Sequence, residues 1–330
     1  MNAGASPQNR MVFIVGRGRS GTTLLRSILH SHPRISVPPE ALFILYLLRG
    51  FREGPWSGRR VRQFTEQLFL EQRMRRWRLD AAGLATRLAS VEDPSFSRLS
   101  AEVYEAYADA AGKTPGRLLG DKNPLFALFT DELAQLFPDA RFVHIVRDYR
   151  DNVLSYQNVP FDLSSPAGLA YRWREYNASI LRTARRLPDR FHRLRFEDLT
   201  VEPQPTLDRL FAFLGLPPEE WVPRSGKDET RPDVEWHRNL DRPIDAQVAQ
   251  QWERSMPAKT VSLLDRICQP LGEELGYAPA GVDGPAEHGR TGVALGWAMT
   301  RLERLLFRFP IRLQATVIDS YRRLTGNVIR

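Results

Sequence analysis

The stretch "FIVGRGRSGTTLLRSIL", residues 13–29, decides the fold. The apolar run 12–15 predicts a buried strand, and apolar residues at helical spacing over 24–29 predict a helix. Three glycines within 16–21 separate the two. The bare backbone N–H groups of such a turn and the positive end of the helix dipole both point toward a bound anion. The stretch therefore predicts a phosphate-binding loop that follows a buried strand.

This loop differs from the common ATP- and GTP-binding loop at one position. The spacing from Gly16 to Gly21 fits that motif, but Thr22 stands where the motif carries a lysine. The positive charge comes earlier, at Arg19. We expect Arg19 to contact a phosphate directly while the loop amides cradle it. The predicted phosphate-binding residues are Arg17, Gly18, Arg19, Ser20, Gly21, Thr22 and Thr23.

A second anion site is predicted in "VHIVRDYRDNVLSY", residues 143–156. Arg147 ends an apolar strand, and Ser155 lies two helical turns later. Ser155 faces the strand end if the helix starts near Asp148. One arginine and one hydroxyl suit a monoester phosphate, although an ion pair that caps the helix is an alternative role for Arg147. Two phosphate sites on one sheet imply a nucleotide that is phosphorylated at two positions.

Strands that alternate with helices along the chain predict an α/β, P-loop-containing three-layer sandwich. Its sheet is mainly parallel, with helices on both faces. Ligands bind such sheets beyond the carboxyl ends of the strands. Polar clusters follow four predicted strands, at 16–23, 38–40, 121–123 and 147–155. The segment 41–115 departs most from this alternation, and we expect its helices to form the wall of an acceptor site.

The C-terminal part of the chain has a different pattern. A Gly- and Pro-rich linker is expected at 279–293 and an amphipathic helical extension at 294–330. One helix face is predicted to carry Leu295, Met299, Leu302, Leu306 and Phe309. We favour docking of this face on the domain or on a second subunit, as in a homodimer. Peripheral contact with a membrane is the alternative, because the segment is also basic.

Composition limits the function classes without choosing among them. The 330 residues are 42% hydrophobic and 26% charged, with a formal net charge of +8. This balance is compatible with nucleic acid, an anionic membrane or a polyanionic small ligand. Cys268 is the only cysteine, which excludes an internal disulfide and a cysteine metal cluster. A polar N-terminus and the lack of an 18-residue apolar run favour the cytoplasm.

The two predicted phosphate motifs together resemble the sulfotransferase superfamily, which uses 3′-phosphoadenosine-5′-phosphosulfate (PAPS). The resemblance continues through "PPE", "GDKNP", "RFEDL", "HRNLDRPI" and "LGEELGY", so it covers roughly residues 11–278. It is closer to the tyrosylprotein and bacterial carbohydrate-type branches than to the cytosolic phenol and steroid branch. The loop reads RSGTT rather than KSGTT. The catalytic histidine and the C-terminal Arg-Lys-Gly segment of the cytosolic branch have no counterpart here.

The resemblance implies a role for each matching residue. The loop residues 19–23 would grip the 5′-phosphosulfate, and Arg147 with Ser155 would grip the 3′-phosphate. Arg238 and Asn239 lie in a late loop that is expected to close over the 3′-phosphate. The expected product is 3′-phosphoadenosine-5′-phosphate (PAP), and no metal ion is expected.

Two further residues are expected to perform the chemistry. The acceptor hydroxyl or amine must lose a proton, and Glu40 follows a strand where the tyrosylprotein-type enzymes carry their catalytic glutamate. An acid near the start of the next helix is the alternative role for Glu40. The leaving oxygen needs a preorganised cation, which Lys122 would provide together with Arg19. The alternative is that Lys122 is a surface lysine beside Asp121. In the catalytic role, Asp121 is expected to orient Lys122.

Two other functions compete with sulfuryl transfer. A small-molecule kinase shares the loop architecture, but it needs the lysine that Thr22 replaces, as well as carboxylates for magnesium. A non-catalytic nucleic-acid binder would explain the net charge and "RMRRWR", residues 73–78, but no helix-turn-helix, zinc or RNA-binding signature is present. We therefore expect no nucleic-acid partner. The acceptor is expected to be a small molecule, a sugar or a phenol.

Overall fold

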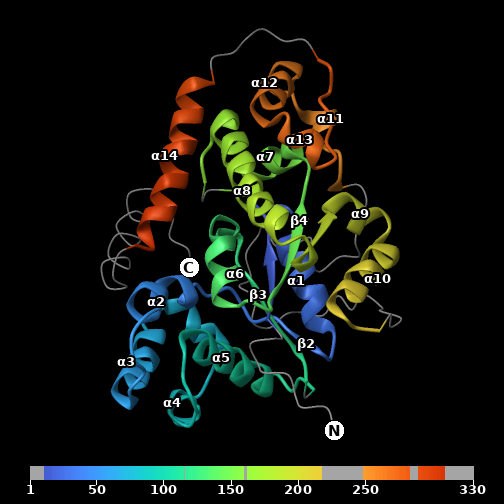
Figure 1. The fold of residues 1–330 in the computed structure, drawn as a ribbon. Coiled ribbons are helices and arrows are strands. Elements are labelled where there is room, and N and C mark those ends of the chain that lie inside the picture. The colour runs from blue at the N-terminus through green and yellow to red at the C-terminus, as the bar shows by residue number, and fades with distance from the viewer. Residues whose placement is uncertain (1–10, 115, 160–161, 218–247, 283–288, 309–330) are drawn as a thin grey trace.

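A five-stranded parallel sheet forms the centre of the computed structural model, which describes residues 11–114, 116–159, 162–217, 248–282 and 289–308 (Figure 1). The strand order is β2-β3-β1-β4-β5, and each neighbouring pair runs parallel. The strands are β1 (Met11–Val15), β2 (Ile35–Ser36), β3 (Leu118–Lys122), β4 (Arg141–Val146) and β5 (Phe191–Arg195). Parallel strands place all their carboxyl ends at one edge, so the predicted polar clusters meet there. The predicted α/β fold class is confirmed.

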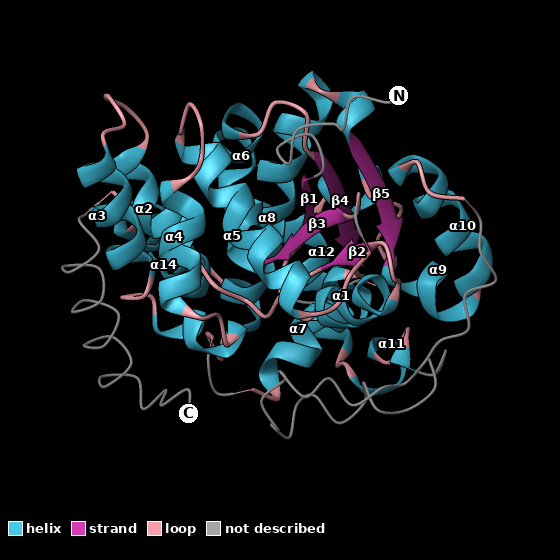
Figure 2. Ribbon diagram, turned by 90° about the horizontal axis from the view of Figure 1, so that it is seen from below, coloured by secondary structure: helices cyan, strands magenta, loops and turns pink. Residues whose placement is uncertain are grey.

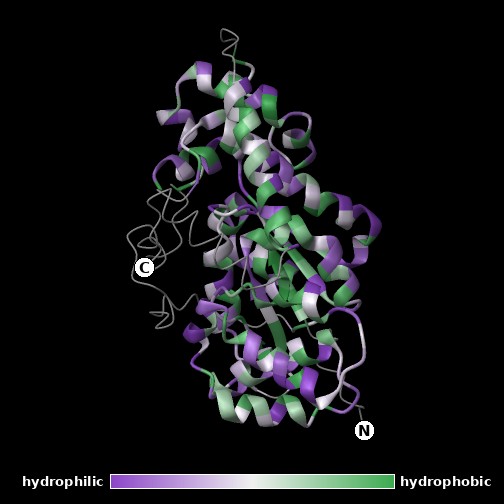
Figure 3. Cartoon of the chain, turned by 90° about the vertical axis from the view of Figure 1, so that its left-hand side faces the viewer, coloured by the Kyte–Doolittle hydropathy of each residue, from purple (hydrophilic) through white to green (hydrophobic). Residues whose placement is uncertain are grey.

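The central strands are apolar along their whole length because the sheet is covered on both faces. Every residue of β1 is buried. Phe13 stacks on Phe142 of the neighbouring strand on one face, while Ile14 and Val143 belong to a separate apolar cluster on the other. The interior around the sheet is accordingly the most hydrophobic part of the molecule (Figure 3). Because successive side chains of a strand point to opposite faces of the sheet, the sheet separates two apolar clusters.

Helices complete the two outer layers (Figure 2). The cluster on one face is completed by α1 (Thr22–Ser31), α9 (Phe196–Val201) and α10 (Pro203–Leu214). The cluster on the other face includes residues of η3 (Pro124–Phe129), α6 (Thr130–Leu136) and α8 (Pro166–Arg186). Beyond the end of β4, α7 (Tyr149–Gln157) packs with α8 and with α12 (Ala258–Cys268). The short elements η4 (Pro188–Arg190), α11 (Trp252–Ser255) and α13 (Leu271–Glu274) connect these parts.

The segment between β2 and β3 is almost entirely helical and forms one end of the molecule in Figure 1. Its elements are α2 (Phe43–Phe51), α3 (Gly58–Leu68), η2 (Gln72–Trp77), α4 (Ala81–Ala89) and α5 (Phe96–Ala110). Rings of Phe43, Trp77 and Tyr104 contact one another inside it. Its apolar residues join the core cluster on one face of the sheet. The insertion is therefore an extension of the core.

The C-terminal helix α14 (Arg290–Leu306) lies along α8 (Figure 1) and differs from the prediction in two ways. It begins within the expected linker. The expected apolar face is also only partly docked: Leu295 is 48% and Leu302 41% exposed, whereas Leu306 packs on the core cluster, and Phe309 lies outside the described residues. The packed side carries Gly296 and Thr300, because a Cβ on Gly296 would lie only 2.7 Å from the Gly168 carbonyl oxygen. Close backbone approach, rather than leucine packing, decides which side docks.

No helix within the described ranges is long and apolar enough to cross a membrane.

Candidate active site

The loop after β1 has the geometry of an anion-binding turn. Arg19 adopts φ 64° and Gly21 φ 87°, and α1 begins directly after Gly21. A Cβ on Gly21 would lie 2.3 Å from the Phe196 ring, and one on Gly18 would lie 2.3 Å from the Tyr156 hydroxyl. The first turn of α1, with its unpaired N–H groups, therefore follows a loop in which positions 18 and 21 have room only for glycine.

The loop is fixed by Asn152, a residue on α7 that the sequence analysis did not identify. Its side-chain amide donates to the Gly18 carbonyl oxygen at 2.8 Å and to the Ser20 hydroxyl at 3.1 Å. Asn152 is fully buried. It thus joins the two predicted phosphate motifs directly. Its position five residues after Arg147, in a helix leaving the adjacent strand, was the available signal.

The structure brings Arg19, Arg147 and Ser155 together at the ends of β1 and β4. Arg19 Nε donates to the Ser155 hydroxyl at 3.1 Å, and Arg147 Nη1 donates to the Arg19 carbonyl oxygen at 3.4 Å. The Arg147 guanidinium lies over the Phe196 ring, 4.7 Å from its centroid, and Nη2 donates to the Val248 carbonyl oxygen at 2.6 Å. The helix predicted to place Ser155 toward the strand end does so.

Two features of this cluster are compatible with an anionic ligand. Burial lowers the pKa of both arginines, and Arg147 further lowers that of Arg19. Arg147 Nε is buried and has no hydrogen-bond partner among the described residues. Asp151 stands 3.8 Å from Arg147, so the alternative ion pair within the helix also forms. It leaves the buried Nε free to donate to a phosphate.

Arg17 differs from the other loop residues. It forms an ion pair with Asp162, and its guanidinium lies 4.3 Å from the Tyr156 ring centroid and 4.6 Å from that of Tyr176. Burial acts most strongly and lowers its pKa, but Asp162, Tyr156 and Tyr176 together outweigh burial, so the net shift of the Arg17 pKa is upward. The Arg17 side chain is therefore engaged within the protein. A role in donor binding stays a prediction.

Glu40 and Lys122 form an ion pair where β2 and β3 end. Lys122 Nζ also donates to the Thr23 hydroxyl at 3.2 Å, which connects the pair to the phosphate-binding loop. Burial acts to raise the pKa of Glu40, but Lys122 and Arg73 outweigh it, so the pKa lies below its usual value. The Lys122 side chain is only 3% exposed and that of Glu40 is 33% exposed. Lys122 is therefore a buried residue of the site.

The segment that carries Glu40 is held by side chains from three other elements. Arg26 on α1 donates to the Val37 and Pro38 carbonyl oxygens at 3.1 and 3.0 Å. Trp77 on η2 donates to the Pro39 carbonyl oxygen at 2.9 Å. The Asn123 amide donates to the Ala41 carbonyl oxygen at 3.1 Å. Sequence analysis missed all three; a lone arginine within the apolar run "LLRSIL" was the clearest signal.

Asp121 has different partners from those expected. Its carboxylate accepts hydrogen bonds from the Tyr104 hydroxyl and the Asn123 amide, because neighbouring strand residues face opposite ways and Asp121 turns away from Lys122. Burial raises the pKa of Asp121 to about 7. Asp121 therefore joins the insertion to the sheet, and Thr23 and Glu40 orient Lys122 instead.

The insertion also contributes charge to the site. The electrostatic influence of Arg73 and Arg76, both half-exposed on η2, reaches Glu40. Arg238 and Asn239 lie outside the described residues. Within the described ranges, no group of three or more His, Cys, Asp or Glu side chains could hold a metal ion.

Comparison with known proteins gives a consistent result. The model of the sulfotransferase family matches residues 11–220, so the chain belongs to the sulfotransferase family. It is 24% identical over 292 residues to protein-tyrosine sulfotransferase 1 of Danio rerio, covering 85% of this chain and 75% of that protein. It is 25% identical to protein-tyrosine sulfotransferase 2 of Gallus gallus, covering 83% and 71%.

Two solved structures share the fold. One is the sulfotransferase domain of the Synechococcus PCC 7002 olefin synthase, with 25% identity, a TM-score of 0.51 and coverage of 78% of this chain and 93% of that one. The other is the sulfotransferase domain from the curacin biosynthetic pathway, with 24% identity, a TM-score of 0.53 and coverage of 81% and 97%. The P-loop-type sulfotransferase fold is thereby established.

Proposed function

We propose that the chain transfers a sulfuryl group from PAPS to a hydroxyl or an amine of an acceptor, within a catalytic domain that spans residues 11–278. The observation that carries this proposal is the pair of adjoining arginines, the half-buried Arg19 and the buried Arg147, at the ends of β1 and β4. Arg19 donates to the Ser155 hydroxyl and Arg147 donates to the Arg19 carbonyl oxygen, and the Lys122–Glu40 pair is linked to the same loop through Thr23. Two phosphate sites beside one acid–base pair suit this donor.

PAPS, when bound, supplies the activated sulfuryl group, and PAP is left. The loop amides of 18–23 and Arg19 would hold the 5′ end of the donor. Arg147 and Ser155 would hold its 3′-phosphate, with Arg238 and Asn239 as further candidates. The buried Nε of Arg147 fits such a ligand, and close packing of Gly18 on Tyr156 and of Gly21 on Phe196 fixes the shape of the loop that would hold it. No metal ion is required by this assignment.

Glu40 would accept the acceptor proton, and Lys122 with Arg19 would neutralise charge on the leaving oxygen. Against the effect of burial, Lys122 and Arg73 hold the pKa of Glu40 below its usual value, which makes Glu40 a weak base. When Lys122 turns to the donor, the burial of Glu40 would raise its pKa. Glu40 would thus become a stronger base only when the donor is in place.

The acceptor is proposed to be a phenol, a sugar or another small molecule, bound against the insertion 41–115. The names of the tyrosine sulfotransferase relatives favour a phenolic hydroxyl, free or in a peptide. The half-exposed arginines of η2 beside Glu40 favour acceptors with a negative charge near the reacting group. Turnover of matched neutral and anionic phenols would test this preference.

For the C-terminal extension 294–330, contact with a membrane surface or a second subunit stays a proposal, as does a cytoplasmic location. The outward Leu295, Trp297, Leu302 and Leu305 of α14 favour such contacts. Sedimentation with and without anionic vesicles separates a dimer from a membrane-bound monomer.

The deciding experiment is thermal stabilisation by PAP compared with ATP plus magnesium. At a hundredfold excess over Kd, a ligand stabilises the fold by about 2.7 kcal/mol. PAP should stabilise the wild type, and Arg147→Ala should abolish the effect, whereas Arg62→Ala on the exposed side of α3 should not. Stabilisation by ATP plus magnesium but not by PAP would overturn the proposal in favour of a kinase.

A further inference from the structure

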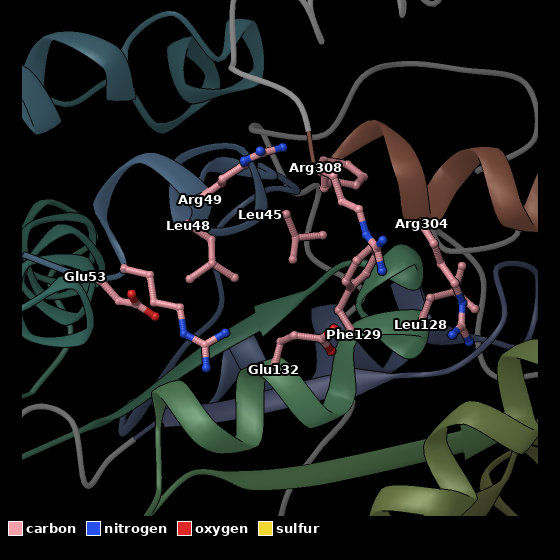
Figure 4. Close-up of a pocket in the computed structure, with 11 residues that line it drawn as sticks. Leu45, Leu48, Arg49, Glu53, Leu128, Phe129, Glu132, Arg304 and Arg308 are labelled. Atoms are coloured by element: carbon pink, nitrogen blue, oxygen red, sulfur yellow. The ribbon is translucent and has the colours of Figure 1, made fainter.

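A pocket of about 540 Å³ lies between the insertion and the C-terminal helix, away from the candidate active site. Its walls come from α2, η3, α6 and the end of α14 (Figure 4). None of the residues proposed above for the donor or for proton transfer lines it. Its volume lies in the range that holds small organic ligands.

Apolar side chains and arginines share the lining of this pocket. The apolar part consists of Leu45, Leu48, Leu128, Phe129 and Phe307. Arg49 reaches it from α2, and Arg304 and Arg308 reach it from the end of α14 (Figure 4). Arg52, which directly follows α2, also lines it. The two carboxylates in the lining, Glu53 and Glu132, leave an excess of positive charge.

The arginines keep their charge available to a ligand. Arg52 donates to the Gln135 amide oxygen at 2.9 Å and Arg304 to the Ser179 hydroxyl at 3.4 Å, so both are held by neutral partners. The side chains of Arg49 and Arg308 have no hydrogen bond or ion pair with any residue that the structure describes. Arg49, Arg52 and Arg308 are exposed to solvent and Arg304 is half-buried, so four cations with no paired carboxylate in the described chain stand at the rim of an apolar lining and attract anions to it.

The wall of the pocket that α14 forms is fixed by contacts with neighbouring elements. Glu303 accepts hydrogen bonds from Arg172 at 2.6 Å and from the Tyr176 hydroxyl at 2.8 Å, which fixes α14 to α8. The Phe307 ring contacts Tyr46 and Phe129 at centroid distances of 5.2 and 5.5 Å. A preformed wall lowers the entropic cost of binding.

We propose that this pocket binds a single-chain anionic amphiphile, a molecule with a phosphate or carboxylate head and an alkyl chain. The chain would cover the leucines and phenylalanines, and the head would lie between the arginines of α2 and α14. An inorganic anion would leave the apolar lining in water, and a neutral chain would leave the guanidinium groups unpaired. The ligand could come from solution or from a membrane leaflet, and both sources present the same chemistry.

The test is calorimetric binding of octyl phosphate to the full chain, with PAP present to occupy the donor phosphate sites. Inorganic phosphate tests the head alone, and octyl glucoside tests the chain alone. We expect each to bind at least tenfold more weakly than octyl phosphate. Hexyl phosphate should also bind roughly tenfold more weakly, because it buries two fewer methylenes.

The variant Arg49→Gln/Arg308→Gln should weaken octyl phosphate binding at least tenfold. Arg59→Gln/Arg62→Gln removes the same charge from the exposed side of α3 and should bind as the wild type does. Equal binding by both double variants, or equal binding of octyl glucoside and octyl phosphate, would overturn the proposal. Both variants keep the same donor site, so the comparison holds whether or not PAP binds.

Vesicles distinguish the two sources of ligand. If the ligand belongs to a membrane, vesicles with a fifth of anionic lipid should bind the wild type and compete with octyl phosphate, and the Arg49→Gln/Arg308→Gln variant should bind them more weakly. If the ligand is free in solution, octyl phosphate should bind without competition from the vesicles.

Discussion

The donor side and the insertion are built by different physical means. The donor side, made of the loop 16–23 and the start of α7, depends on close backbone approach and on hydrogen bonds from Asn152 and Arg147. The insertion depends on apolar helix packing around Trp77 and Tyr104. The two meet at Glu40, whose segment is held from the donor side by Arg26 and from the insertion by Trp77. The contacts that fix the loop 16–23 are thus separate from the apolar packing that fixes the insertion.

The largest effect is expected where the two regions meet. Glu40→Gln removes the proposed base and should lower turnover by about 10²- to 10⁴-fold. Stabilisation by PAP should remain, because the donor phosphates are held elsewhere. Initial rates with a phenolic acceptor measure the change, and Glu66→Gln on the exposed side of α3 is the control. Turnover within threefold of wild type would remove Glu40 from the mechanism.

Glycine-to-alanine substitutions should impair ligand binding in the loop after β1 and stabilise the fold in the insertion. Gly18→Ala adds a Cβ only 2.3 Å from the Tyr156 hydroxyl and should weaken PAP binding at least tenfold. Gly50→Ala in α2 adds a Cβ into open space and should stabilise the fold by roughly 0.5–1 kcal/mol. Calorimetry and thermal unfolding measure the two. Unchanged PAP affinity in Gly18→Ala would contradict the proposed cradle.

The insertion is expected to tune the base through charge. Arg73 lowers the pKa of Glu40, so Arg73→Gln should raise it. A base acts only when deprotonated, so the acid side of the kcat/KM profile should move to higher pH. The profile of Arg62→Gln should match the wild type. A profile of Arg73→Gln that stays in place or moves to lower pH would separate Arg73 from the site.

A pH-dependent effect concerns the contact between β3 and the insertion. The pKa of Asp121 is raised to about 7 in the folded protein, so the folded state binds an extra proton between about pH 4 and 7. The free energy of unfolding should therefore fall as pH rises through this window, by about 1 kcal/mol per pH unit. Asp121→Asn should flatten this dependence. Denaturant unfolding at several pH values measures it; an equal slope in both proteins would place the titration elsewhere.

Local patterns predicted the elements well and the partners of individual side chains poorly. The strand 141–146 and the loop after 15 follow from apolar runs and glycine spacing, which depend on neighbours in the chain. The partners of Arg17 and Asp121 depend on residues distant in sequence, Asp162 and Tyr104, and no spacing rule reaches them. The outward turn of Leu295 on α14 likewise depends on the glycine contact with α8.

The sequence by itself determined the α/β class, the phosphate-binding loop and the residue types that suit sulfuryl transfer, because these arise from short-range periodicity and from chemistry at strand ends. Tertiary structure alone decided that Arg19, Arg147 and Ser155 form one cluster, that Lys122 pairs with Glu40, and that arginines of α2 and α14 surround a pocket away from the candidate active site. Such groupings join segments far apart in the chain, and only the packing of the whole molecule brings them within contact distance.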